Sequence, residues 1–451
     1  MRQKIRQQLS FVESYIDHPH AAELATMSGL IEACPIIAAL VHEDLVRGLD
    51  DPETGREGLL TAEQVFRAIV IKQMNGYSYS ELAYHLADSK CYRAFCGIGY
   101  GDKHPSDSTL QRDIKRVRPE TLEEINRRLI TVAKEKDIED GRKIRTDCTV
   151  VESNIHHPTD SSLLEDCVRV LSRLTSRAKE DFELDTTFSD HSRRAKKRAL
   201  QILNAKSEKK RVKPYKDLLS VTERTVSYAT AAAVSLEVII AMGMMGAEEA
   251  AKELRHFISL AEQVISQTRR RVLMKESVPA AEKVVSIFEP HTDIIVKDRR
   301  DTYYGHKIAI SGGASGLITD LVIEDGNPAD VTLAQEMVER QQKIYGRVPR
   351  QVAYDGGFAS KGNLSEIKGM GVKDVSFSKK CGLQIADMAK STWVYKKLRD
   401  FRAGIEGIIS FLKRSFGMRR CTWRGLSSFK AYAWSSVVTA NLLMMARHLL
   451  S

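Results

Sequence analysis

Apolar residues in the first third of the chain recur at intervals of three and four, the spacing of a helix with one buried face. The segment 36–45 shows this spacing. Two capping-box patterns, Thr61–Gln64 and Ser78–Glu81, predict helices over about 61–75 and 78–87. Only Gly76–Tyr77 separates these helices. The pair therefore resembles a helix-turn-helix, with an ordinary helical hairpin as the alternative.

The pattern changes to alternation at Ile144–Val151, which is rich in β-branched residues and predicts a strand. Two further capping patterns predict helices that begin at Ser108 and at Ser162. From the second of these to about residue 288, the helical spacing is nearly continuous. We therefore expect one strand followed by a long helical segment.

Strands return in the last third, where 304–311 and 316–323 flank Gly312–Gly313 as a predicted hairpin. A helix, a short strand, a helix, a strand and two helices follow, over 331–344, 351–355, 360–369, 373–377, 402–416 and 430–449. This order predicts a mixed α/β fold, and it is also the order of an RNase H-like core with a helical insert after the first strand. The expected divisions are a helical N-terminal domain over 1–140, the first core strand in 141–155, a helical insert over 156–290, and the rest of the core with the C-terminal helices over 291–451.

The composition is that of a folded protein, since 43% of the 451 residues are hydrophobic and 28% are charged. The seven cysteines include no CxxC pair, which fits a reducing compartment without a zinc site or a disulfide framework. The N-terminus lacks the apolar segment of a secretory signal. The most apolar stretches, 228–247 and 431–446, fall short of a membrane span in length or purity. We expect a cytoplasmic protein with no membrane partner.

The net charge of +10 is concentrated in one segment rather than spread along the chain. Residues 1–140 carry 18 basic and 23 acidic groups, whereas residues 193–216 carry 11 basic groups and one acidic group. A solvated helix face is the alternative, but this imbalance favours a contact with a polyanion. The candidate residues of this basic run for an anion contact are Arg193, Arg194, Lys196, Lys197, Arg198, Lys209, Lys210 and Arg211.

Three carboxylates fall on separate predicted elements of the core. Asp147 lies within the first strand, Asp355 ends the short strand and precedes two glycines, and Glu406 lies in a helix. Ligand sites in α/β sheets gather at strand ends. Oxygen ligands suit Mg²⁺, and two such ions about 3.5–4 Å apart can act on a phosphodiester. Any one of these acids alone is more often a cap or a surface residue, as we expect for Asp330, so the prediction depends on all three.

Two cations flank Glu406 on the same helix, because Arg402 lies one turn before it and Lys413 about 10 Å after it. Residues 396–424 carry nine basic groups and two acidic ones. A surface salt-bridge stripe is the alternative, but a metal ligand between two cations suits DNA phosphates.

Five segments, in this order, resemble bacterial insertion-sequence transposases of the DDE class, most closely the ISNCY-type group. They are Thr146–Leu164, Tyr304–Lys307, Asp325–Asp330, Tyr354–Ser360 and Arg402–Glu406, and the helical segment 61–116 resembles the same family. The resemblance covers most of the chain. One difference is Arg399, which stands where an aromatic residue often precedes the Arg of the third motif.

The resemblance implies an RNase H-like core in which Asp147, Asp355 and Glu406 form a DDE triad that binds two Mg²⁺ ions, or Mn²⁺ in their place. It also assigns Arg402 and Lys413 as the basic residues of the third motif. The implied activity is cleavage at the insertion-sequence ends and strand transfer into target DNA, by a bacterial, nucleoid-associated protein. The implied partners are the terminal inverted repeats, the target DNA and a second copy of the chain. The helices of 61–116 are the candidate segment for recognising the repeats.

Two other functions stay open at this point. One is a DNA-binding regulator that keeps the fold of a transposase but has no catalytic activity, which the intact triad disfavours. The other is an RNase H-like nuclease that cuts without joining strands, which the sequence does not separate from a transposase.

Overall fold

A computed structural model describes residues 3–5, 17–48, 60–99, 101–297, 301–324, 326–379 and 381–451. The chain divides into two compact units. The first unit combines Met1–Glu152 with His306–Ser451, and the second is Ser153–Gly305. The predicted insert, 156–290, lies within the second unit. Asp325 of the third family-like segment lies outside the described residues.

The first unit begins with helices, as the apolar spacing predicts. They are α1 (Pro19–Glu32), α2 (Ile36–Val46), α3 (Ala62–Asn75), α4 (Tyr79–Asp88), α5 (Lys90–Phe95), α6 (Asp107–Arg116) and α7 (Pro119–Glu135). Both predicted capping boxes form at the starts of α3 and α4. Gly76 ends α3 with a φ of 67°, a left-handed conformation that glycine adopts without strain. The predicted helix start at Ser108 is wrong, because Ser106 is the cap of α6 and accepts from the amide of Thr109.

A mixed sheet follows, which confirms the α/β class. Its strands are β1 (Lys143–Glu152), β2 (Asp293–Lys297), β3 (Asp301–Gly312), β4 (Ile318–Ile323), β5 (Gln351–Tyr354) and β6 (Asp374–Phe377), in the order β2-β3-β1-β5-β6, with β4 also paired to β3. β1, β5 and β6 run parallel, and β3 is antiparallel to β2 and β4. The sequence pattern did not predict β2, a short strand with two charged ends.

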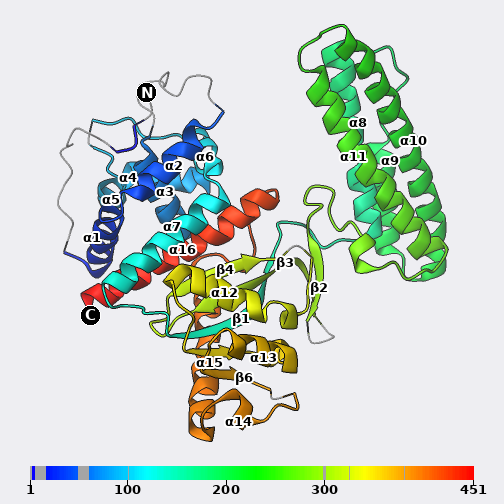
Figure 1. Ribbon diagram of the computed structural model, residues 1–451. Coiled ribbons are helices and arrows are strands. Elements are labelled where there is room, and N and C mark those ends of the chain that lie inside the picture. The colour runs from blue at the N-terminus through cyan, green and yellow to red at the C-terminus, as the bar shows by residue number, and fades with distance from the viewer. Residues whose placement is uncertain are drawn as a thin grey trace. The chain divides into compact units, whose positions relative to one another are not determined.

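Apolar residues lie on both sides of this sheet within the first unit. Along β3, Ile308 and Ile310 belong to one core cluster and Ala309 to another, as the alternation of a strand requires. The second cluster also takes in residues of α12 (Ala334–Tyr345), α13 (Lys361–Gly369) and α14 (Ile385–Met388), together with the first part of α15 (Thr392–Ser415). α15 packs against β1, β5 and β6 (Figure 1). It starts ten residues before its predicted position at 402.

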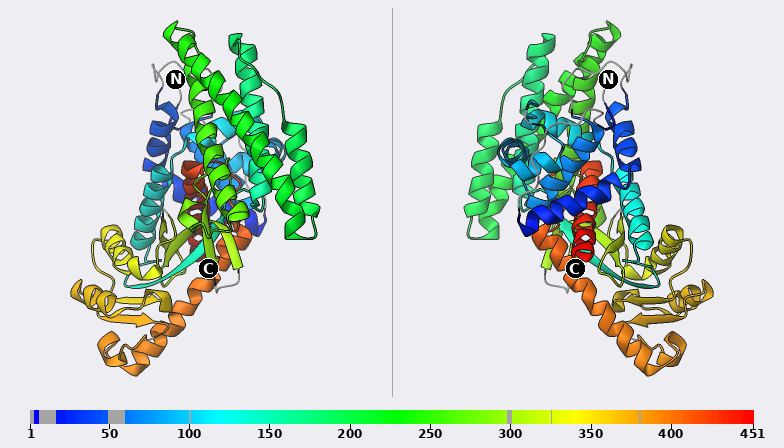
Figure 2. Two further views of the ribbon diagram at one scale, coloured as in Figure 1. Left: turned by 90° about the vertical axis from the view of Figure 1, so that its right-hand side faces the viewer. Right: turned by 90° about the vertical axis from the view of Figure 1, so that its left-hand side faces the viewer.

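The last helix, α16 (Leu426–Leu450), is buried along most of its length. It packs against α1, α3 and α7, so the C-terminus of the chain completes the core of the N-terminal helices (Figures 1 and 2). A helix that is apolar on all sides is expected in such an interior position. The N-terminal helices and most of the mixed sheet therefore share one folded unit.

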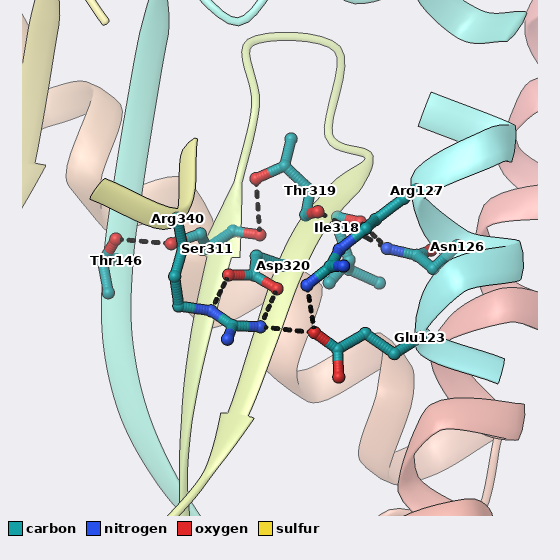
Figure 3. Close-up of polar contacts among 9 residues, drawn as sticks. All are labelled: Glu123, Asn126, Arg127, Thr146, Ser311, Ile318, Thr319, Asp320 and Arg340. Carbon is teal, nitrogen blue, oxygen red and sulfur yellow. Dashed lines mark hydrogen bonds and ion pairs between the residues drawn. The ribbon is translucent and has the colours of Figure 1, made fainter. Parts of the chain in front are cut away.

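A charged network fixes α7 against the sheet. Arg340 of α12 forms two hydrogen bonds to the carboxylate of Asp320 on β4, at 2.5 and 2.8 Å (Figure 3). The same guanidinium lies 2.9 Å from Glu123 of α7. The side chain of Asp320 is 1% exposed and that of Arg340 is 22% exposed, so the acidic member of the pair is buried. Removing one member of such a pair lowers the stability of the fold, because it leaves the other charge buried without a partner.

The second unit is mainly helical, with α8 (Asp160–Phe182), α9 (Ser192–Asn204), α10 (Glu208–Ala241) and α11 (Ala247–Thr268) packed side by side (Figure 1). The predicted cap at Ser162 is wrong, because the N-cap of α8 is Thr159, whose side chain accepts from the Ser162 amide. Among the described residues, α10 by itself meets the length and composition of a membrane span, and α1 with α2 meets them only as a pair bent by 78°. One such helix is weak support for a span, and α10 packs against α8, α9 and α11.

Candidate active site

Two of the candidate carboxylates lie on neighbouring parallel strands, Asp147 within β1 and Asp355 directly after β5. Thr146 of β1 is paired with Tyr354 of β5, so Asp147 and Asp355 follow at adjacent positions. The hydroxyl of Thr146 is hydrogen-bonded at 2.8 Å to that of Ser311 on β3, which fixes β1 from its other side (Figure 3). The arrangement predicted from the strand pattern is therefore present.

Arg402 joins all three carboxylates. Its Nη2 lies 2.7 Å from Oδ2 of Asp147 and 3.1 Å from Oδ1 of Asp355, and its Nη1 lies 2.9 Å from Oε1 of Glu406. Because two carboxylate oxygens contact one nitrogen at these distances, they are at most 5.8 Å apart. The structure therefore brings Asp147, Asp355 and Glu406 to one place, with a guanidinium among them.

The three acids differ in their exposure. The side chains of Asp147 and Arg402 are 14% and 15% exposed, whereas that of Glu406 is 67% exposed. Asp355 lies between these limits at 39%. The site thus has a shielded side at β1 and an open side at α15, where a large substrate has access to it.

Ser378 fixes the carboxylate of Asp355. It directly follows β6, the parallel neighbour of β5, and its hydroxyl donates to Oδ1 of Asp355 at 2.7 Å. Burial raises the pKa of Asp355, but the Ser378 hydrogen bond, the Gly356 amide and the charge of Arg402 outweigh it and lower the pKa. Asp355 is therefore held as a carboxylate.

Both glycines after Asp355 are needed for close packing. A Cβ on Gly356 would lie 2.8 Å from Cβ of Lys379, and one on Gly357 would lie 2.8 Å from Oδ2 of Asp330. The turn that carries Asp355 therefore has no room for side chains at these two positions. The two glycines are recognisable in the sequence, but the neighbours that require them, Lys379 and Asp330, come from the folded structure.

Lys307 and Asp330 form an ion pair beside this turn, with 2.9 Å between Nζ and Oδ1. Lys307 also donates to the carbonyl of Pro328 at 2.5 Å. The expectation that Asp330 is a helix cap is wrong, since its carboxylate pairs with Lys307 and makes no cap hydrogen bond. Both residues stand in the family-like segments, but the sequence pattern did not predict a role for Lys307 or for Ser378. The position of Ser378 directly after a parallel strand was the available signal.

The donor set suits a hard divalent cation, because it consists of carboxylate oxygens from three elements. Within the described part of the chain, however, no three His, Cys, Asp or Glu side chains stand close enough together to hold a metal ion. The three acids converge on the guanidinium of Arg402 instead. The chemistry of the ligands thus fits Mg²⁺.

Lys413 lies in the last turn of α15, on the helix that carries Arg402 and Glu406, and it is partly exposed. Arg399 is exposed on the same helix. The predicted spacing of Arg402, Glu406 and Lys413 along one helix is therefore present. Of the two cations, Arg402 points into the carboxylate cluster.

The predicted basic run lies in the second unit, on α9 and the start of α10. Two of its members, Arg194 and Arg198, form ion pairs with Asp217, one residue beyond the run. Hydrogen bonds from these two arginines lower the pKa of Asp217 to about 2. Arg211 donates to the carbonyl of Ala205. The run members that are exposed are Arg193, Arg194, Lys196, Lys197, Lys206, Lys209, Lys210, Arg211, Lys213 and Lys216.

Two segments of the chain match known protein families. Residues 295–442 match the family described as "Transposase DDE domain", and residues 12–116 match "Transposase domain (DUF772)". The first match includes Asp355, Arg402 and Glu406, and the second includes the predicted helix-turn-helix. Asp147 lies outside both. No curated protein and no solved structure matches the chain significantly. The two family matches support an insertion-sequence transposase.

Proposed function

We propose that the protein is a DDE transposase that cuts DNA at the ends of an insertion sequence and joins them to target DNA. The observation that carries the proposal is the convergence of Asp147, Asp355 and Glu406 on one guanidinium, from β1, the end of β5 and α15. The match of residues 295–442 to a transposase DDE domain supports it. The sheet order with a helical insert after β1 supports an RNase H-like core. The five ordered segments favour the ISNCY-type group.

The three carboxylates are the proposed ligands of two divalent cations, Mg²⁺ or Mn²⁺. Such a pair, when bound, activates a nucleophilic oxygen and stabilises the leaving oxygen of a phosphodiester. The low pKa of Asp355 keeps that group ionised for this purpose. Ser378 orients its carboxylate, and the packed glycine turn fixes its backbone, so this ligand is positioned before DNA binds.

Water is the proposed nucleophile in the first step, which releases a 3′-hydroxyl at each end of the element. That hydroxyl is the nucleophile in the second step, in which a bond to target DNA forms as a phosphodiester of the target breaks. One phosphodiester replaces another, so no nucleotide cofactor is needed. The chain's own contribution is positioning and charge neutralisation.

DNA contacts are assigned to cations and helices outside the carboxylates. Lys413 and the basic residues of α9 and the start of α10, arginines as well as lysines, are proposed to bind the DNA backbone phosphates, which gives affinity without sequence reading. The helices of 61–116 are proposed to recognise the terminal repeats. A homodimer on DNA is proposed because two ends must be joined in one event, and the protein is placed in the bacterial cytoplasm with the nucleoid.

The test incubates the purified chain with DNA that carries the ends of its own insertion sequence, together with target DNA and Mg²⁺. We expect both cut ends and joined products from the wild type, and neither from Asp147→Asn or Glu406→Gln. Asp400→Asn is the matched control, because Asp400 is exposed on α15 and contacts none of the three carboxylates.

The same assay separates the alternatives. A nuclease without strand transfer would give cut ends and no joined products. A regulator without catalytic activity would bind the ends and give neither product. Cleavage that is unchanged in both Asp147→Asn and Glu406→Gln would refute the assignment of the triad.

A further inference from the structure

The side chain of Arg402 is less exposed, and has more protein partners, than is expected of a residue that binds DNA at the protein surface. Its side chain is 15% exposed, and its Nε is buried without a hydrogen-bond partner among the described residues. Both of its Nη atoms are engaged by the three carboxylates. A phosphate could reach this guanidinium only after it had left those partners.

The charge balance of the cluster explains why the guanidinium stays there. Three carboxylates around one point repel one another, and Asp147 and Asp355 are too shielded for water to screen them fully. One planar guanidinium with five N–H donors in a fixed geometry can satisfy all of them at once, whereas an ammonium group has only three donors. Arg402 thus provides the positive charge that the site needs.

We infer that Arg402 is a resident cation of the carboxylate site, which occupies the oxygens of Asp147 and Asp355 until a divalent cation takes its place. The inference rests on the proposed function, since it concerns the same three acids. Its physical basis is that Nη2 of Arg402 contacts one oxygen of each of these two aspartates. Those contacts and the binding of a metal between the two aspartates exclude each other.

Two consequences follow for the site. Metal binding must overcome the ion pairs of Arg402, so this residue weakens the affinity of the free protein for metal. Once displaced, the guanidinium stays on α15 one turn from Glu406, where a phosphate of bound DNA can become its new partner. Arg402 would then link metal loading to DNA binding, because DNA offers the displaced side chain an alternative anion.

The experiment measures Mn²⁺ binding to the full chain without DNA, by the loss of the free-Mn²⁺ electron paramagnetic resonance signal. Wild type is compared with Arg402→Gln, Arg402→Lys and Arg414→Gln, where Arg414 is an exposed arginine of the same helix. We expect Arg402→Gln to bind Mn²⁺ about tenfold more tightly or better, because a competing cation is gone. The Mn²⁺ affinity of Arg402→Lys should lie between those of the wild type and Arg402→Gln. The affinity of Arg414→Gln should equal that of the wild type.

A second readout is the thermal midpoint of the chain without metal. Arg402→Gln should lower it, since the three carboxylates lose their counter-ion, and saturating Mn²⁺ should raise the midpoint of this variant more than that of the wild type. Equal Mn²⁺ affinities in the wild type and Arg402→Gln would overturn the inference, as would metal-free midpoints that do not differ.

Asp355→Asn, made in the wild type and in the Arg402→Gln variant, distinguishes this inference from the proposed function. If Asp355→Asn abolishes Mn²⁺ binding but Arg402→Gln leaves the affinity unchanged, the metal site stands and the role of Arg402 fails. If Arg402→Gln tightens binding but transposon ends are never cut, Arg402 is a resident cation and the proposed transposase activity fails. If Asp355→Asn has no effect on Mn²⁺ binding in either background, both fail.

Discussion

Nη2 of Arg402 lies 2.7 Å from Oδ2 of Asp147, although 255 positions separate the two residues in the chain. This contact joins α15 to β1, across the sequence of the second unit. The candidate site is therefore complete only when the two parts of the first unit have folded together. Residues on either part can be tested separately for their effects on DNA binding, stability and catalysis.

The basic run gives the first prediction. Changing Lys196, Lys197, Lys209, Lys210 and Lys213 to Gln should weaken DNA binding and reduce the slope of log K against log salt by up to about 4.5, if all five contact phosphates. Arg194 and Arg198 are left intact because Asp217 already pairs with them. Filter binding or fluorescence anisotropy at several salt concentrations measures the slope.

Arg224→Gln with Lys252→Gln is the control for that prediction, because both residues are exposed in the second unit outside the run. It should leave the slope nearly unchanged. An unaltered slope in the five-lysine variant would show that the run is an ordinary solvated helix face.

The buried pair of Arg340 and Asp320 gives the second prediction. Arg340→Met should lower the free energy of unfolding by about 3 kcal/mol or more, because it leaves the carboxylate of Asp320 buried without its partner. Arg347→Met should cost no more than about 1 kcal/mol, since its ion pair with Asp140 is exposed and 4.0 Å long. Urea unfolding followed by circular dichroism compares the two; similar losses would contradict the assigned role of the buried pair.

Much of the fold was predictable from local patterns. The capping boxes at Thr61 and Ser78 located α3 and α4, and β-branched alternation located β1. The starts of α6 and α8 were misplaced because several hydroxyl residues stand close together there, and the sequence does not say which one caps. The early start of α15 was missed because the prediction began at Arg402 and left Thr392–Phe401 unassigned.

The turn after β5 gives the third prediction. Gly356→Ala should reduce DNA cleavage about tenfold or more, because the added Cβ meets Cβ of Lys379 and must displace the turn that positions Asp355. Gly362→Ala is a matched control in α13, where the nearest atom to an added Cβ is 3.8 Å away. Both variants should remain folded by circular dichroism. Equal cleavage rates in the two would mean that the turn tolerates a side chain.

Lys72 gives a prediction for pH. Burial lowers its pKa to about 8, while its Nζ donates to the carbonyl of Tyr77 at 2.7 Å in the turn between α3 and α4. Between pH 8 and the ordinary pKa of 10.5, the unfolded chain therefore holds a proton that the folded chain has lost. The contribution of this group to stability must then rise with pH across that window.

The measurement is urea unfolding at pH 7 and pH 9.5 for the wild type and Lys72→Met. The wild type should gain stability relative to the variant at the higher pH. Lys115→Met, at an exposed position on α6, should show no such relative change. If the free energies of unfolding of the wild type and Lys72→Met differ by the same amount at both pH values, Lys72 does not titrate in this range.

The sequence pattern picked out the three acids that converge in the structure, but not their immediate partners. The strand pattern and the helix spacing pointed to Asp147, Asp355 and Glu406 without any three-dimensional information. The sequence spacing also placed Arg402 on the same helix face as Glu406, which predicted a contact with a DNA phosphate. Its insertion between the aspartates depends on how α15 packs across β1 and β5, which is a tertiary relationship. The contact of Ser378 with Asp355 likewise depends on the parallel pairing of β5 with β6.

The most direct measurement is the single-turnover rate of cleavage at the insertion-sequence end in Mg²⁺, for wild type, Asp355→Asn and Asp374→Asn. Asp374 is a buried aspartate on β6 that accepts hydrogen bonds from Gln351 and the Lys390 amide, outside the carboxylate cluster. We expect Asp355→Asn to lower the rate at least about a hundredfold, with end binding retained, because a charged ligand of the proposed cations is lost. Asp374→Asn should cleave at close to the wild-type rate once the rate is corrected for the fraction of the protein that is folded. Cleavage by Asp355→Asn at the wild-type rate would contradict the account.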